Sequence, residues 1–183
     1  FQISRKMRMP LVICIGLGNN QGDHMGYTPL DISIRQQDSL PGMVTVAAAG
    51  NEAGRAHHYL GLQQTANTPD SVEIFVQENT AGFFLELWGQ PPELFSVGFR
   101  SPVGEVIPKI PARLGKTEVV RFFLQDTVIY LNYELIQNTS GNQLIFIRFE
   151  KPTPGIWTVD VYTSNRQNGD YHIWLPITGF VQP

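Results

Sequence analysis

The stretch Asp70-Ser71-Val72-Glu73-Ile74-Phe75-Val76 alternates apolar side chains with polar or aromatic ones. Successive side chains of a β-strand point to opposite sides, so Val72, Ile74 and Val76 fall on one face of a strand. One apolar face opposite a mixed face predicts a half-buried strand, as in a sheet that packs against a single core.

Short runs of the same kind recur through the rest of the chain and are separated by turn residues. The runs are Phe95–Phe99, Val119–Leu124, Val128–Glu134, Leu144–Phe149, Trp157–Tyr162 and Tyr171–Leu175. The turn signals between them are Gln90-Pro91-Pro92, Ser101-Pro102-Val103-Gly104, Asn138-Thr139-Ser140-Gly141-Asn142, Pro152-Thr153-Pro154-Gly155 and Asn168-Gly169-Asp170. About eight short strands punctuated in this way predict an antiparallel sandwich, most specifically a jelly roll.

The segment before this alternation has a different rhythm. Leu11–Ile15 and Met43–Ala49 are continuous apolar runs, and this pattern predicts strands that are buried on both faces. Between them, Thr28-Pro29-Leu30-Asp31 predicts a helix start, and the helix is expected to reach about Gln37 before Pro41-Gly42 stops it. Strand, helix and strand in this order predict a βαβ unit. The expected fold class is an α/β fragment followed by an all-β antiparallel jelly-roll sandwich.

Composition and charge narrow the classes of function. Apolar residues make up 42% of the 183 residues and charged residues 16%, a balance typical of globular domains with a core. The net charge of −3 gives no case for a nucleic-acid partner, and no apolar stretch approaches the roughly 20 residues that span a bilayer. Cys14 is the only cysteine; its place in an apolar run predicts a buried thiol. Neither nucleic acid nor a membrane is an expected partner.

Two strings at the ends of the predicted parallel strands resemble a known family. Residues 44–52, Val-Thr-Val-Ala-Ala-Ala-Gly-Asn-Glu, are similar to the subtilisin-family strand that ends in the oxyanion-hole asparagine. Residues 11–18 are similar to the preceding strand of that family, whose glycine-bearing end runs along the bound substrate. Other strings resemble one branch, the clostridial subtilases related to Csp-type germination proteases, in which a jelly-roll domain is inserted between the oxyanion asparagine and the catalytic serine. These strings are Pro10–Ile13, Asn19–Leu30, Ala48–Glu52 followed by His57-His58, and Tyr171–Pro176.

The resemblance implies a subtilisin-like serine endopeptidase that acts on a peptide or protein substrate without a metal or cofactor. It implies that residues 1–66 are part of the catalytic domain, that 67–178 are the inserted jelly-roll domain and that 179–183 begin the return to the catalytic domain. Asn51 would supply the oxyanion-hole carboxamide. The implied substrate-binding residues are Gly16, Leu17 and Gly18, which would pair with an extended peptide, Ala48, Ala49 and Gly50, which would form a pocket wall, and Glu52, which would favour a basic substrate residue.

Some family features do not occur in this sequence. The Asp, His and Gly-Thr-Ser segments of the triad are missing, Gly16 stands where the family often has serine, and Ala53 where it often has glycine. We therefore expect a fragment that is inactive alone and that packs on the missing remainder of the catalytic domain, on its own β domain or, as a homodimer, on a second copy. His57 and His58 are adjacent and lack a chelating spacing, so we expect them to be structural.

Other interpretations remain open at this stage. Asn51 can simply cap a turn, as Gly-Asn pairs often do. The β half can be a binding module for protein or for carbohydrate, if Trp88, Trp157 and Trp174 form a platform for stacking sugars, although aromatic residues of a sandwich more often lie in its core. A signalling pseudoprotease is a further alternative.

Overall fold

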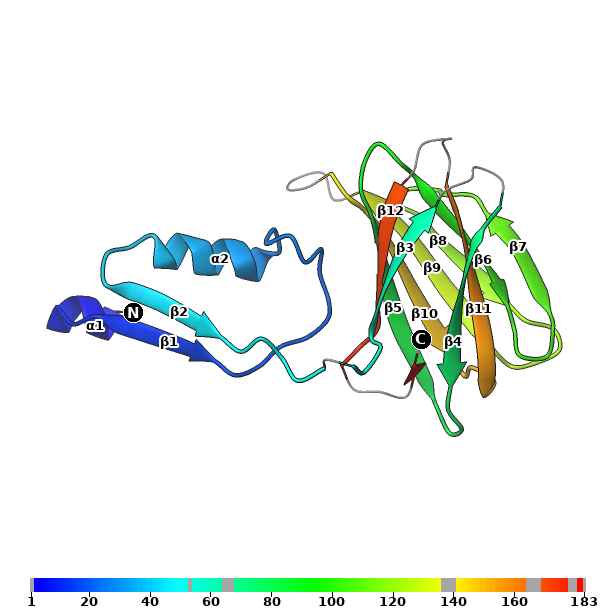
Figure 1. Ribbon diagram of the computed structural model, residues 1–183, viewed down its shortest axis with the longest axis horizontal. Coiled ribbons are helices and arrows are strands. Elements are labelled where there is room, and N and C mark those ends of the chain that lie inside the picture. Colours follow the sequence, from blue (N-terminus) through cyan, green and yellow to red (C-terminus); the bar gives the residue numbers. More distant parts are fainter. Residues whose placement is uncertain are drawn as a thin grey trace.

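The computed structural model describes residues 2–52, 54–63, 68–135, 141–163, 169–177 and 181–182. The N-terminal part holds α1 (Gln2–Met7), β1 (Leu11–Ile15), α2 (Pro29–Asp38) and β2 (Met43–Ala47). It extends to one side of a larger β-rich body, which contains all the later strands (Figure 1). None of the described helices is long and apolar enough to cross a membrane.

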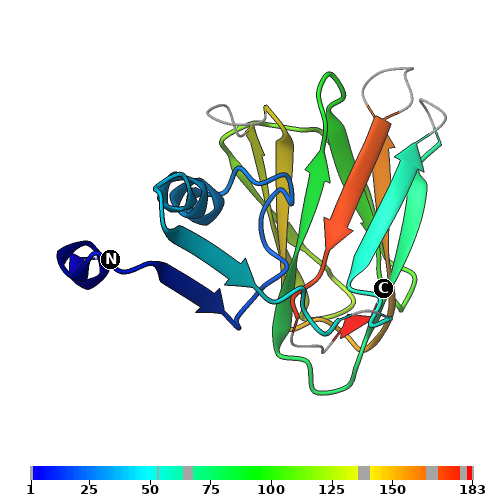
Figure 2. The ribbon, with the colours of Figure 1, turned by 60° about the vertical axis from the view of Figure 1, so that its left-hand side comes forward.

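Two antiparallel sheets form this body. One has the strand order β3 (His58–Gln63), β12 (Gly169–Trp174), β5 (Gly82–Gly89), β10 (Gln143–Glu150), β9 (Val128–Leu135) and β8 (Thr117–Arg121). The other has the order β13 (Val181–Gln182), β4 (Asp70–Val76), β11 (Gly155–Thr163), β6 (Phe95–Arg100) and β7 (Val106–Ile110). The sheets face each other as a sandwich (Figures 1 and 2).

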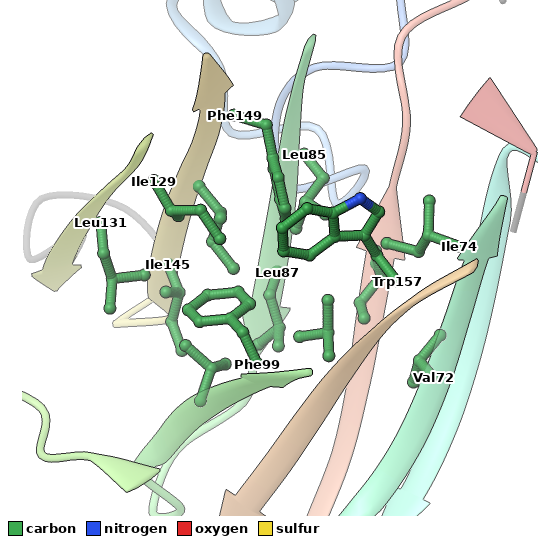
Figure 3. Packing of buried hydrophobic residues seen from close by; sticks show 14 of the residues in the cluster. Val72, Ile74, Leu85, Leu87, Phe99, Ile129, Leu131, Ile145, Phe149 and Trp157 are labelled. Atoms are coloured by element: carbon green, nitrogen blue, oxygen red, sulfur yellow. The ribbon is translucent and has the colours of Figure 1, made fainter. Parts of the chain in front are cut away.

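The core lies between these sheets and consists of the inward-facing side chain of every second residue. In β4 the alternation is as predicted, since Val72, Ile74 and Val76 are buried while their neighbours are half-buried or exposed. Trp157 and Phe149 come from opposite sheets and meet edge-on with ring centroids 5.4 Å apart (Figure 3). Aromatic and branched side chains fill this space, so hydrophobic burial is the main source of stability.

The helix between β1 and β2 begins as predicted. The Thr28 side chain accepts a hydrogen bond from the Asp31 backbone N–H, and Oδ2 of Asp31 accepts one from the Thr28 N–H at 3.1 Å, which completes a capping box. Pro29 occupies the first turn, where its missing N–H costs nothing. Local chemistry alone therefore fixes this helix start.

The predicted fold class, an α/β fragment with the βαβ unit of a parallel subtilase sheet ahead of a jelly roll, is wrong. Within the described residues the chain is mainly antiparallel β, and β1 and β2 form a parallel sheet of two strands that no third strand joins. The two apolar runs are not buried on both faces, because exposed and half-buried residues alternate along β1 and the first residues of β2. One face of this small sheet is left open, so the parallel layer of the predicted class is not built.

Three local predictions also fail. Cys14 is exposed rather than buried, because it lies on the open face of β1. β2 ends at Ala47, two residues earlier than predicted. The run Val119–Leu124 is a strand only as far as Arg121; Phe123 and Leu124 lie beyond its end with 92% and 71% of their surface exposed.

Candidate functional site

The predicted site residues follow the two parallel strands. Gly16, Leu17 and Gly18 come after β1, and residues 48–52 come after β2. Ile15 and Ala47 are register partners, and the Ala48 N–H donates to the Ile15 carbonyl at 3.0 Å. Parallel strands end at the same edge of a sheet, so the structure brings the two segments together there.

This edge is accessible to a ligand. Gly16, Leu17, Gly18, Ala48, Ala49, Gly50 and Asn51 are all exposed, and Glu52 is half-buried. Gly50 has a φ of +95°, which glycine adopts without strain, and this turns the chain away from β2 just before Asn51. The Asn51 carboxamide therefore sits on a turn at the end of a parallel strand, outside any core.

The carboxylate of Glu52 lies close to an imidazole ring. Oε2 of Glu52 lies 3.0 Å from Nδ1 of His57, whose side chain is only 7% exposed. The approach is close, but its angle is not that of an aligned hydrogen bond. His57 lies just before β3 and is buried, while His58 begins β3 instead of lying in a loop; a structural role for His57 stays a prediction.

Leu175, a residue of the sandwich, forms hydrogen bonds with both the segment after β1 and the segment after β2. The Leu175 N–H, just beyond β12, donates to the His57 carbonyl at 2.8 Å. The Leu175 carbonyl accepts from Nδ2 of Asn20 at 3.0 Å. Asn20 belongs to the segment after β1, and His57 belongs to the segment after β2. The backbone N–H and carbonyl of the buried Leu175 therefore connect both segments to the sandwich.

Beside this anchor lies a stack of four aromatic rings, His24, Trp174, His58 and His172, which we term the ring stack. The Trp174 ring stacks on His24 at 3.6 Å and on His58 at 3.9 Å between centroids. Nε2 of His58 lies 2.8 Å from Nδ1 of His172, so one of these nitrogens donates to the other. Burial lowers the pKa of His58, and the charges of His172 and His24 lower it further. Burial also lowers the pKa of His172, and His24 adds to this while Asp170 opposes it.

A cavity of about 100 Å³ lies next to the ring stack. Its lining residues are Asp23, His24, Met25, Trp88, Gln90, Asn142, His172 and Trp174. The first three belong to the loop after β1 and the others to the sandwich or its connecting turns, so the cavity marks the seam between the two parts.

The tryptophans do not form a platform for sugars. Trp157 is fully buried in the core, and Trp88 is 8% exposed with its Nε1–H bound to Glu86. Both faces of Trp174 carry a histidine ring. Within the described residues no group of three histidine, cysteine, aspartate or glutamate side chains has the arrangement of a metal site. The chemistry on offer at the edge is that of backbone groups, one carboxamide and one carboxylate.

Comparison with solved structures places this arrangement in context. The structure of the Clostridium perfringens CspB protease matches 98% of this chain with a TM-score of 0.84 and 24% sequence identity. The two share a fold. This chain spans 37% of the length of that protease chain. A comparison with protein-family models gives no match, and neither does one with curated protein sequences.

Sequence reasoning missed the residues that hold the site in place. Leu175 read only as the end of an apolar run, and His24 and Trp174 are 150 positions apart in the sequence. Their contacts arise when β12 returns beside β3 and β5, an order that no local pattern encodes. No feature of Leu175, His24 or Trp174 taken alone indicates these contacts.

Proposed function

We propose that Gly16–Gly18 and Ala48–Glu52 form the oxyanion hole and part of the substrate cleft of a subtilisin-like serine endopeptidase of the clostridial Csp-type branch. The observation that carries the proposal is that Asn51 is exposed and directly follows Gly50, which has a positive φ, four residues beyond the parallel strand β2. The sequence resemblance and the fold shared with the CspB protease support it.

In this role the Asn51 carboxamide donates to the oxyanion of the tetrahedral intermediate. Gly16 to Gly18 pair through their backbone with an extended peptide, in the manner of an added strand. Ala48, Ala49 and Gly50 leave room for the substrate residue before the scissile bond. Glu52, with a carboxylate at the pocket end, favours a basic residue there. No step of this scheme calls for a metal or cofactor.

The proposed partner of the cleft part is the remainder of the catalytic domain, which supplies the triad. The open face of the β1–β2 sheet supports this, since Val12, Val44 and Val46 each expose more than half of their surface. Apolar sheet faces of this kind usually pack on another layer. A second copy of the chain is the alternative cover, and light scattering across a concentration series distinguishes a monomer from a homodimer.

Peptide binding by this chain tests the cleft assignment. We expect an extended peptide with one arginine to shift the amide NMR signals of Gly16–Gly18. Glu52→Gln should weaken binding of this arginine peptide more than it weakens binding of a leucine peptide of the same length. Signals that stay in place at saturating peptide would remove the cleft assignment.

Turnover tests the oxyanion assignment in a protease that contains these residues together with a triad. Loss of one oxyanion donor in a subtilisin lowers kcat about 10²–10³-fold, and we expect Asn51→Ala to do the same with little change in KM. Gln36→Ala removes an exposed carboxamide from α2 and serves as the matched control. Unchanged kcat in Asn51→Ala would exclude this residue from the mechanism.

A further inference from the structure

Three successive contacts fasten residues 20–24 of the segment after β1 to the sandwich, and Nδ2 of Asn142 donates to Sδ of Met25 at 3.2 Å just beyond them. Asn20 donates to the Leu175 carbonyl, and the Gly22 N–H donates to Oε2 of Glu86 at 2.9 Å. The third point is the ring of His24, which lies nearly parallel to Trp174, with 12° between the planes. No backbone hydrogen bond of a sheet fixes residues 16–22, so these contacts determine where the segment lies.

The backbone at His24 is turned to make the third contact. Its φ is +53°, in the left-handed region that is uncommon for residues with a side chain, although histidine occurs there more often than most. Gly22 and Gly26, also at positive φ, allow the chain to bend on either side. Nε2 of His24 lies 3.2 Å from the Asn20 carbonyl, which couples the ring to the first fastening point.

The charges that face this ring come from several elements. His58 on β3 and His172 on β12 lie on the other side of Trp174. The acids nearby are Asp170 on β12, Glu86, which is the register partner of Trp174 on β5, and Asp23, which lines the same cavity as His24. In the neutral pair one of the two imidazole nitrogens 2.8 Å apart donates to the other, so a second proton added to the stack meets the like charge of the first.

We propose that His24 is a positioning residue whose ring latches the Gly16–Gly22 segment onto the sandwich, and that protonation of the ring stack releases the latch. The role of this segment in substrate binding rests on the proposed function; the latch itself does not. A single protonated ring is attracted to the indole face, so release begins with the second proton.

The direction of the pH effect follows from the histidines of the sandwich. Burial lowers the pKa of both His58 and His172, and Asp170 opposes this at His172. The His24 ring of the latched form lowers both pKa values further, so the latched form holds these protons less tightly than the released form. Latching is therefore complete above the ordinary histidine pKa of 6.5 and is lost as the pH falls below it.

Backbone NMR relaxation of the 183-residue chain tests the latch. At pH 8 we expect amide order parameters of ~0.85 for residues 16–22, and values below ~0.6 at pH 5. His24→Asn removes the ring but suits the left-handed backbone, and we expect mobility at both pH values. His172→Gln keeps a hydrogen-bonding partner for His58 without its charge, so release should shift to lower pH. The imidazole signals report when each histidine titrates.

Two results would overturn the proposal. One is an ordered segment in His24→Asn at pH 8, which would show that the ring holds nothing. The other is a wild-type segment that stays ordered after His58 and His172 have both been protonated. If the latch behaves as expected while no peptide perturbs Gly16–Gly18, the latch stands and only the proposed function fails.

Discussion

Glu86 joins the N-terminal part to the sandwich, and its removal should be measurable as lost stability. Its Oε2 accepts two hydrogen bonds, from the Gly22 N–H and from Nε1 of Trp88, both at 2.9 Å. Glu86 is 7% exposed and Trp88 is 8% exposed, so water cannot replace the carboxylate without a rearrangement. Glu86→Ala leaves the indole N–H buried without its acceptor.

The magnitude follows from these two bonds. A hydrogen bond to a charged group contributes about 1.5–3 kcal/mol, and an orphaned buried donor costs about 1–3 kcal/mol. Part of this loss is offset because the alanine variant no longer has to bury a carboxylate. Only the Trp88 bond lies wholly within the sandwich, so we expect Glu86→Ala to lower the free energy of unfolding by about 2 kcal/mol, and somewhat more if the N-terminal part unfolds together with the sandwich.

Urea denaturation followed by both circular dichroism and tryptophan fluorescence measures this loss and tests two-state behaviour. Glu118→Ala is the matched control, because Glu118 lies in the same sheet but pairs at 3.2 Å with Arg113, whose side chain is 63% exposed. Exposed pairs contribute less than about 1 kcal/mol. Equal, small losses in the two variants would refute the idea that Glu86 is a buried anchor.

Three individual residues, Tyr133, Cys14 and Gly61, give further predictions. Burial raises the pKa of Tyr133 to about 12. The free energy of unfolding in urea should therefore fall as the pH rises above the ordinary tyrosine pKa of 10, because the phenol ionises in the unfolded state before it does in the folded state, and an unchanged value would contradict this burial. Tyr133→Phe, which leaves the Ile110 carbonyl without its donor, should cost about 1–2 kcal/mol in urea denaturation. Cys14 is exposed and should react fully with a thiol reagent in the native state, whereas slow labelling would mean that the β1 face is covered. Gly61→Ala should cost roughly 1–3 kcal/mol of unfolding free energy, since the added Cβ would lie 2.0 Å from Cζ of Tyr171, and an unchanged thermal midpoint would contradict this packing.

Local patterns predicted the features whose causes are local. Period-two alternation identified β4, and the residues at 28–31 identified the start of α2, since neighbours in sequence create both signals. These elements needed no knowledge of the distant chain.

The failures have distant causes. β3 contains Gly61 and did not read as a strand, yet Gly61 is there because the Tyr171 ring fills the space of its missing side chain. The apolar residues Phe123 and Leu124 read as a strand, but the Glu105 carboxylate accepts both of their backbone N–H groups, at 2.8 and 3.0 Å, and so removes them from the ladder. Periodicity likewise does not reveal how many layers cover a strand, which is why β1 and β2 were predicted to be buried.

The motif with the strongest functional signal lies on the part of the chain with the least core of its own. α2 has no buried residue, and β1 and β2 form a sheet of two strands, which is marginal without further packing. The sandwich, by contrast, has a continuous apolar core. The segments after β1 and β2 are therefore held in place chiefly by contacts with the sandwich, through Leu175, Glu86 and the ring stack. It follows that substitutions at this seam should disturb the segments around Gly16–Gly18 and Asn51 before they disturb the sandwich, because local opening there breaks a few polar contacts and leaves the core intact.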